Sequence, residues 1–243
     1  MTDTPTTFSP PRQARSRQSL ERYLDAAEAL IRTNGFADLN ITEVARLAGF
    51  SVGGIYSRFP SKLSLLSAVR ERFLERVETH LSTEYEAGSG NDASLEEAIT
   101  RMLGLFFRHF IAEQEVFRAF VIETPNNPGF EEGGEVATER RREMFREALV
   151  AHAGEIRRPD PEAAIDWVFT VVMALIRERL VYGEAAPITG GHTDQELLTR
   201  LVQTVFVYLS APLETQRLDV ISWAGELQDS CKRGRKAPDS QEA

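Results

Sequence analysis

The stretch from Ile41 to Phe59, ITEVARLAGFSVGGIYSRF, constrains the fold more than any other part of the sequence. Its first half carries apolar residues at steps of three and four, which predicts a short helix with one apolar face. Asn40 is a good N-cap for this helix, and Gly49 stands where a helix ends in a left-handed residue. Ser51 can then cap a second short helix. Two short helices joined by a tight turn that contains glycine are typical of a helix-turn-helix, which reads DNA.

The second of these helices has an unusual outer face. Its apolar residues recur at three- and four-residue steps and are expected to point inward. Two adjacent glycines in a helix each cost about 1 kcal/mol relative to alanine. Because the sequence accepts that cost, we expect another surface to come very close to this backbone. The residues left outside are Gly53, Gly54, Tyr56, Ser57 and Arg58.

Four short motifs fall at fixed offsets between residues 17 and 66. They are Asn34-Gly35-Phe36, Ile41-Thr42, Ala48-Gly49-Phe50-Ser51, and a Gly-x-x-Tyr-x-x-Phe-x-x-Lys run from Gly53 to Lys62. Together they resemble the DNA-binding domain of the TetR/AcrR family of transcriptional regulators. The sequence departs from the family's pattern at three positions, where a polar residue, a Thr or Ala, and an acidic residue are more usual. These positions are Val52, Gly54 and Leu63.

The resemblance implies an all-α chain with two domains. An N-terminal three-helix helix-turn-helix domain is expected at residues 17–62, and a helical effector-binding and dimerisation domain at residues 63–229. Residues 1–16 and 230–243 are expected to form a disordered arm and a disordered tail. The resemblance also implies a dimeric repressor that binds an inverted-repeat operator in double-stranded DNA and is released by a small hydrophobic or amphipathic effector. A dimer would present two reading helices about one helical turn apart.

The candidate DNA contacts follow from the outer face and from the resemblance. Arginine can donate two hydrogen bonds to guanine, so Arg58, with Ser57, is a candidate for base edges or nearby phosphates. Tyr56 resembles the family's phosphate-contacting tyrosine, although it could instead pack in the core. Lys62 could clamp a phosphate at a helix N-terminus or could simply be solvated. The full set of expected contacts is Thr42, Ser51, Val52, Gly53, Gly54, Tyr56, Ser57, Arg58 and Lys62, with Arg15 and Arg17 in an arm that could also be a solvated tail.

Charge is distributed unevenly along the chain. The net charge is −9, yet the residues up to position 70 include nine basic and six acidic side chains, which leaves −12 for the remainder. A basic head on an acidic body fits a protein that touches phosphate with one end only.

The rest of the composition argues against a disulfide-stabilised protein, a metalloprotein and a membrane or secreted protein. The single Cys231 excludes an internal disulfide framework and a cysteine-based metal site, and fits a reducing cytoplasm. The four histidines show no metal-ligand spacing, so neither a metal nor another cofactor is expected. No apolar run reaches the length needed to cross a bilayer, and no signal peptide is visible.

Helix boundaries follow from caps and breakers. We expect the first helix at Gln18–Thr33, and a long helix beginning after Ser61 that carries the head into the body. A loop is expected at Glu84–Asn91, and a mostly polar helix from about Val136 to Ala153.

The body carries enough aromatic and thioether surface to line a ligand pocket, although the same residues would serve as an ordinary core. The pocket candidates are Met102, Phe106, Phe107, Phe110, Phe117, Phe120, Met144, Trp167 and Met173.

Two segments near the C-terminus, Ala163–Ile176 and Leu197–Leu209, are more apolar than a single buried stripe requires. We expect a four-helix dimer interface across a two-fold axis. The alternative is a monomer whose central helices are enclosed by its own chain. The interface candidates are Val168, Val172, Ile176, Leu198, Val202, Val205, Phe206 and Leu209.

Two other functions remain open. An effector-independent regulator or nucleoid-associated protein would have its body pocket filled by side chains. An all-α enzyme is the more distant alternative, because the sequence shows no nucleophile–base pair, no glycine-rich phosphate loop and no metal cluster.

Overall fold

The computed structural model describes residues 12–123 and 131–212. Within these ranges the chain is all-α, as expected, and contains no strand. A small head is formed by α1 (Arg12–Asn34), α2 (Ile41–Ala48) and α3 (Val52–Tyr56). The body contains α4 (Lys62–Gly88), α5 (Leu95–Ala112), α6 (Gln114–Glu123), α7 (Glu131–Val150), α8 (Pro161–Tyr182) and α9 (Asp194–Ser210).

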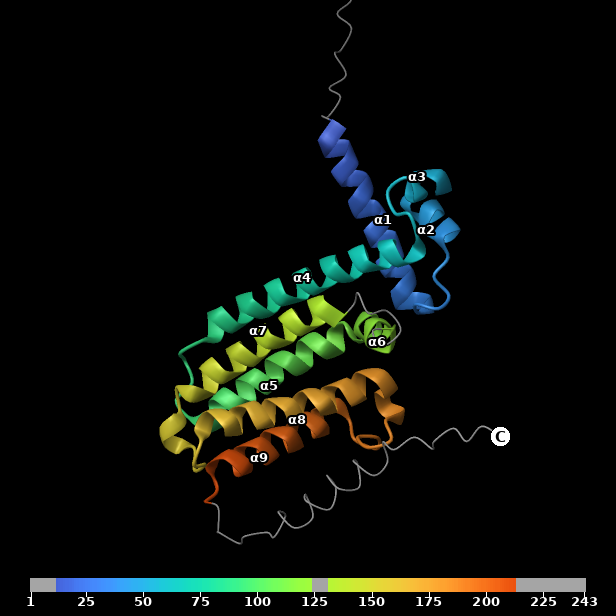
Figure 1. Cartoon of the computed structure of the whole chain (residues 1–243). Coiled ribbons are helices and arrows are strands. Elements are labelled where there is room, and N and C mark those ends of the chain that lie inside the picture. Colours follow the sequence, from blue (N-terminus) through green and yellow to red (C-terminus); the bar gives the residue numbers. More distant parts are fainter. Residues whose placement is uncertain (1–11, 124–130, 213–243) are drawn as a thin grey trace, which may run out of the picture.

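The long helix α4 connects the two parts (Figure 1). It starts beside α2 and α3 and runs along the top of the body, above α7 and α5, while α8 and α9 form the lower layers. The short helix α6 lies at the end of the body nearest the head and contacts both α1 and α8. A displacement of α4 or α6 would therefore reach the head directly.

The expected caps of α2 and α3 are confirmed. The Asn40 side chain accepts a hydrogen bond from the Thr42 N–H at 2.8 Å, and Gly49 closes α2 with a φ of 75°. The Ser51 hydroxyl accepts from the Gly54 N–H at 3.2 Å and starts α3. Local side-chain chemistry thus fixes both ends of the turn.

The body helices are also capped as expected. Ser61 and Ser64 form a reciprocal capping box at the start of α4. Asp160 caps α8, with a proline in the first helical position. Thr193 and Glu196 form the capping box of α9.

Three helix boundaries differ from the expectation. Helix α1 begins at Arg12, so residues 12–16 belong to a helix and not to a disordered arm. Helix α4 continues through Gly88, and α7 begins at Glu131. In each case the residues near the expected end include good helix formers, and no proline enforces a stop. The expected tail at residues 230–243 and the arm residues 1–11 lie outside the described ranges.

A glycine inside α7 has a packing reason. A Cβ atom at Gly134 would lie 2.9 Å from Nη2 of Arg70, a buried residue of α4. A larger residue at this position would require the end of the Arg70 side chain to move.

Candidate nucleic-acid interface

Helix α3 is anchored from beneath and open on its outer face. Ile55 has no exposed surface and Phe59 is buried, whereas the Tyr56 side chain is 51% exposed. Gly53 on the same short helix and Ser57, the C-cap residue that follows Tyr56, are exposed as well. The core alternative for Tyr56 is therefore excluded in this structure. An exposed aromatic hydroxyl on a reading helix can donate a hydrogen bond to a phosphate oxygen.

The two adjacent glycines have different surroundings. A Cβ atom at Gly53 would meet nothing within 4 Å, so the fold itself does not require a glycine there. A Cβ atom at Gly54 would lie 2.7 Å from the Tyr23 hydroxyl of α1. Gly54 is thus explained by packing inside the head. Only Gly53 remains a place where an external surface can approach the backbone closely.

Arg58, just after α3, contacts the beginning of α1. Its Nη2 donates a hydrogen bond to the Ser16 hydroxyl at 2.6 Å, and the side chain is half-buried. This bond fixes the guanidinium group beside the reading helix. Ser16 was not among the residues expected from the sequence, because a contact between positions so far apart leaves no local signal.

Thr42 and Lys62, the two residues expected to contact phosphates at helix N-termini, both make hydrogen bonds within the head. Thr42 is exposed, but its N–H is occupied by the Asn40 cap, so only its hydroxyl is available to a phosphate. The Lys62 ammonium donates to the Ala37 carbonyl oxygen at 3.3 Å and lies 5.5 Å from the centre of the Phe36 ring. Lys62 is therefore pinned to the loop before α2, in contrast to a freely solvated lysine.

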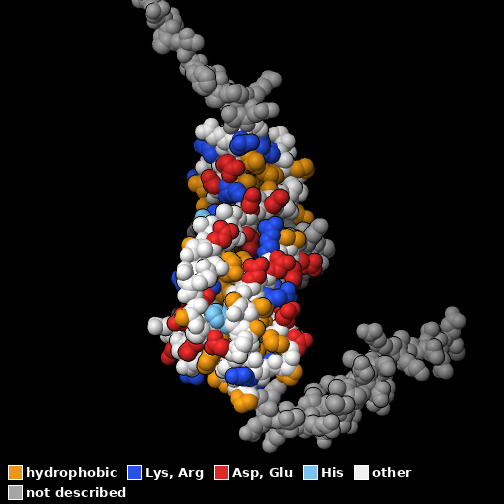
Figure 2. Space-filling view, turned by 90° about the vertical axis from the view of Figure 1, so that its left-hand side faces the viewer, with side chains coloured by type: hydrophobic (Ala, Val, Ile, Leu, Met, Phe, Trp, Pro, Cys, Tyr) orange, Lys and Arg blue, Asp and Glu red, His pale blue; other side chains and the backbone are white. Residues whose placement is uncertain are grey.

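Further basic groups surround these residues. Arg15 and Arg17 lie in the first turns of α1 and not in an extended arm, and Arg17 is exposed. The Arg22 guanidinium lies 4.9 Å above the Phe50 ring, beside the turn between α2 and α3. Arg46 on α2 is exposed as well. Figure 2 shows Lys and Arg side chains near the head end of the molecule, where a phosphate backbone would be attracted.

The aromatic residues of the body are packed against one another. Met102, Phe106, Phe107, Phe110, Phe117 and Phe120 are all buried. The Phe110 and Phe117 ring centres are 4.8 Å apart, and the Phe106 ring lies 6.1 Å from that of Phe145. These distances are typical of direct aromatic contact. In the state described here these side chains form a core.

The other pocket candidates lie elsewhere. Met144 and Met173 are half-buried at the edge of the core. Trp167 is 56% exposed and therefore lies outside the buried core of the body. Thr170, on the next turn of α8, is exposed as well.

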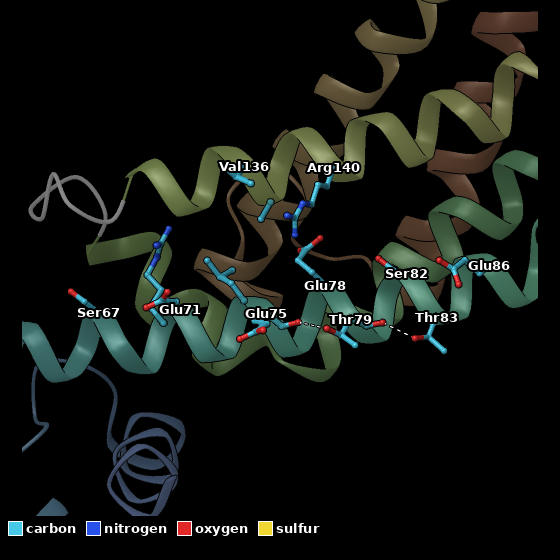
Figure 3. Close-up of a pocket in the computed structure, with 13 residues that line it drawn as sticks. Ser67, Glu71, Glu75, Glu78, Thr79, Ser82, Thr83, Glu86, Val136 and Arg140 are labelled. Atoms are coloured by element: carbon cyan, nitrogen blue, oxygen red, sulfur yellow. Dashed lines mark hydrogen bonds between the residues drawn. The ribbon is translucent and has the colours of Figure 1, made fainter. Parts of the chain in front are cut away.

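The largest groove of those we describe runs between α4 and α7 (Figure 3). It has a volume of about 970 Å³ and is lined by hydroxyl and charged side chains. The Thr79 and Thr83 hydroxyls along it donate to carbonyl oxygens one turn earlier in α4, at 2.7 and 2.8 Å. Its lining includes Glu71, Glu75, Glu78 and Glu86 of α4, with Val136 and Arg140 across from them on α7.

A second groove lies between α8 and α9 and has a volume of about 300 Å³. Its lining is largely apolar and includes Trp167, Val171, Leu175, Leu201 and Tyr208. The exposed Trp167 ring stands at its rim. An apolar groove next to an exposed tryptophan is typical of a protein–protein contact.

The expected dimer residues fall into two groups. Leu198, Val202 and Phe206 are half-buried on α9. Val168, Val172, Ile176, Val205 and Leu209 are buried within the single chain. The reason is that α8 is covered by α5, α6, α7 and α9 of its own protomer. These five residues are therefore covered mainly by their own chain, as the enclosed-helix alternative expects, although Val168 and Val205 also line the groove between α8 and α9.

The described residues contain neither a candidate membrane-spanning helix nor a candidate metal-binding cluster. None of the helices there is both long and apolar enough to cross a membrane. Within the same ranges, no group of three or more His, Cys, Asp or Glu side chains is arranged to hold a metal ion.

Comparison with known proteins places the head in a family. Residues 24–69 match the family model described as bacterial regulatory proteins, tetR family. The HTH-type transcriptional regulator EthR of Mycolicibacterium smegmatis is 27% identical over 135 residues, which cover 52% of this chain and 61% of EthR. The HTH-type transcriptional repressor KstR of the same organism is 27% identical over 113 residues, covering 46% of this chain and 55% of KstR. The alignments thus span somewhat more than half the length of these relatives.

A solved structure extends the similarity to the body. A protein of Mesorhizobium loti, described as a TetR-family transcriptional regulator, superposes with a TM-score of 0.62 at 17% identity. The superposition covers 82% of this chain and 96% of that protein. At this identity the match establishes the shared fold of head and body.

Proposed function

Because this chain belongs to the TetR family of bacterial regulatory proteins, whose members are transcriptional regulators and not enzymes, we propose that it binds double-stranded DNA and represses transcription. The observation that carries the proposal is the outer face of α3. There Tyr56 is half exposed, Gly53 is open, and Arg58 is fixed at the end of the helix. The target is an inverted repeat, because a two-fold dimer offers the same reading helix twice.

Within this proposal the head residues have distinct roles. Arg58 and Ser57 contact base edges or nearby phosphates, and Gly53 lets the backbone approach the groove. Tyr56, Thr42 and Lys62 contact phosphates on either side. Ser51 and Val52 begin the reading helix, and Arg15 and Arg17 contribute attraction from the start of α1. Gly54 remains a candidate contact, and its packing against Tyr23 gives a separate reason for glycine at that position.

The test begins by finding the operator. Footprinting upstream of the protein's own coding region and its neighbours would supply an inverted-repeat duplex. Fluorescence anisotropy then compares Tyr56→Ala and Arg58→Ala with the wild type. Arg157→Ala is the matched control, because it removes the same charge from an exposed position in the body.

Each outcome bears on the proposal. The loss of one good arginine–guanine pair is expected to weaken operator binding by about 1–3 kcal/mol. Arg157→Ala should bind like the wild type at moderate salt. Unchanged affinity in both head variants would reject α3 as the reading surface.

The homodimer is part of the proposal, and we place its interface on the outer face of α8 and α9. Support comes from the apolar groove between these helices and from the exposed Trp167 beside it. The half-buried Leu198, Val202 and Phe206 of α9 lie in the same helical layer. Sedimentation equilibrium of Trp167→Glu tests this placement, with Ile122→Glu, on the exposed side of α6, as the control. A dimer that survives Trp167→Glu at micromolar concentration would move the interface elsewhere.

Release by a small hydrophobic or amphipathic effector is the regulatory part of the proposal. The rings of the body are closely packed, so an effector would have to displace side chains such as Phe110 and Phe117. The same packing favours the second candidate, an effector-independent DNA-binding regulator. A thermal-shift screen with hydrophobic carboxylates, sterols and aromatics, followed by operator release, separates the two. If no compound raises Tm and releases DNA, the effector-independent candidate is preferred.

A further inference from the structure

A buried glutamate joins the head to α4. Glu28 of α1 has only 7% of its side chain exposed and accepts hydrogen bonds from three arginines. Arg32 donates at 2.8 Å, Arg76 at 2.7 and 3.1 Å, and Arg72 at 3.2 Å. Arg72 and Arg76 belong to α4, so Glu28 fixes α1 against the helix that leads into the body.

A second glutamate extends this cluster into the body. Glu113 stands at the corner between α5 and α6. Its carboxylate pairs with Arg32 of α1, and with Arg76 of α4 at 3.6 Å. Arg32 and Arg76 therefore each bind both Glu28 and Glu113. We call Glu28, Arg32, Arg76 and Glu113 the corner cluster.

Arginine is essential to this arrangement. A guanidinium group presents several N–H donors in a rigid plane and can bind two carboxylates at once, whereas a lysine ammonium behaves as a single point charge. Burial disfavours the Glu28 carboxylate, but hydrogen bonds from Arg76 and Arg32 outweigh burial and lower its pKa. Glu28 is thus ionised at neutral pH and held in place by its arginine partners.

The cluster is remote from the reading surface. Ser16, which bonds Arg58, and Arg32 are sixteen residues apart on α1, a separation of about 24 Å along a helix. No member of the cluster can touch DNA that is bound to α3. Any influence on DNA binding must pass through the orientation of α1.

The body end of the cluster is tied to α8. Helix α6, which begins directly after Glu113, packs on α8, and Nε of Arg118 donates to the Leu180 carbonyl oxygen at 2.7 Å. A shift of α8 or α6 would therefore displace Glu113 relative to Arg32 and Arg76. This gives a contiguous set of polar contacts from the lower body to the head.

We propose that Glu113 is a positioning residue for operator binding, which holds the head in its DNA-binding orientation through Arg32 and Arg76. The inference rests on the proposed DNA-binding function. It adds the α5–α6 corner as the place where the body controls the head. Helix α1 packs on both α4 and α6, so this corner adds a polar contact to the packing that already joins head and body.

The experiment compares Glu113→Gln with Glu115→Gln. Both changes remove one negative charge from the same corner, but Glu115 is exposed and has no ion pair among the described residues. A second variant, Arg32→Lys, leaves the net charge unchanged while replacing the planar donor. Each is made in a Cys231→Ser background with dye-labelled cysteines at Leu47 of the head and Thr100 of the body, both exposed positions. Labelled chains are diluted with unlabelled protein.

Single-molecule energy transfer measures the head–body distance without DNA. We expect Glu113→Gln and Arg32→Lys to broaden or shift the distance distribution, and Glu115→Gln to leave it unchanged. If only a fraction of heads remains in the binding orientation, operator affinity falls by the same factor, about threefold to tenfold. Thermal melts confirm that each variant is folded.

The outcomes separate the inference from the function on which it rests. An unchanged distance distribution in Glu113→Gln and Arg32→Lys would overturn the inference even if the protein binds its operator. A broadened distribution with unchanged or increased operator affinity would overturn the role in DNA binding. If the wild type binds no operator at all, the proposed function fails, while the distance measurement still reports on the head–body contact.

Discussion

The head and the body share one continuous apolar core but differ in the other contacts that their helices make. In the head, short helices are fixed by caps and single polar bonds, such as Asn40 to Thr42 and Arg58 to Ser16. In the body, long helices enclose a core of aromatic rings, with Phe106, Phe145 and Phe169 in mutual contact. Both parts are stabilised by buried apolar area, but the head places fewer aromatic rings in it. Local caps and single polar bonds therefore have a larger share in fixing the short helices of the head.

The largest effect is expected in the body. Phe106→Ala should lower the free energy of unfolding by about 3–5 kcal/mol, because the ring is completely buried among other rings. Ile122→Ala, at an exposed position outside the proposed dimer interface, should change it by less than about 0.5 kcal/mol. Urea unfolding followed by circular dichroism measures both. A loss below about 1 kcal/mol for Phe106→Ala would show a loosely filled body, as a ligand pocket would require.

The next effect lies at the junction of the two regions. Glu28→Gln should cost about 2 kcal/mol at pH 7, because a buried charge-assisted acceptor is lost while its arginines remain. The pKa of Glu28 is lowered in the folded state below its ordinary value of 4.5, since its arginine partners outweigh burial. Its stabilising contribution is therefore complete above pH 4.5 and disappears as the pH falls through the lowered folded-state pKa.

Unfolding titrations at several pH values check this sign. The difference between wild type and Glu28→Gln should shrink in acid, whereas Glu75→Gln, at an exposed position of α4, should show no such dependence. A difference that grows in acid would contradict the assignment of an ionised Glu28.

The head was easier to predict from sequence than the body's surfaces. Asn40, Gly49 and Ser51 act on backbone groups only a few residues away, so their roles are visible in the sequence. The Ser16–Arg58 bond and the Arg70–Gly134 contact join distant segments and depend on how whole helices pack. No local pattern encodes them.

For the apolar helices near the C-terminus, too, the sequence alone does not identify the packing partners. Hydrophobic composition indicates that Val172 and Leu209 are covered, but not which chain covers them. In the structure their own protomer does so, because α8 lies between several body helices. The residues left for a partner, such as Trp167 and Val171, can be identified only once the neighbours of each helix are known.

The two adjacent glycines of α3 are expected to respond differently to substitution by alanine. Gly54→Ala should cost about 1–3 kcal/mol of folding stability, because its methyl group would collide with the Tyr23 hydroxyl. Gly53→Ala should be neutral or stabilising by up to about 1 kcal/mol, since its site is open and alanine favours a helix. Urea unfolding of each variant, paired with operator titration, measures both effects. Gly53→Ala should nevertheless weaken operator binding, and equal affinity with the wild type would reject close approach of DNA at that point.

The smallest effect concerns the bond that orients Arg58. Ser16→Ala removes one hydrogen bond from an exposed site, worth about 0.5–1.5 kcal/mol, so operator affinity should fall about threefold to tenfold with little change in Tm. Ser67→Ala is the matched control, because its hydroxyl bonds only to the Leu63 carbonyl oxygen of its own helix. The decisive measurement compares the affinity of each protein variant for the operator with its affinity for duplexes altered at single base pairs. If Ser16 orients Arg58 toward a base, the variant loses discrimination at one position of each half-site. If affinity falls equally on every duplex, Arg58 contacts only the phosphate backbone, and the head reads its sequence through other residues.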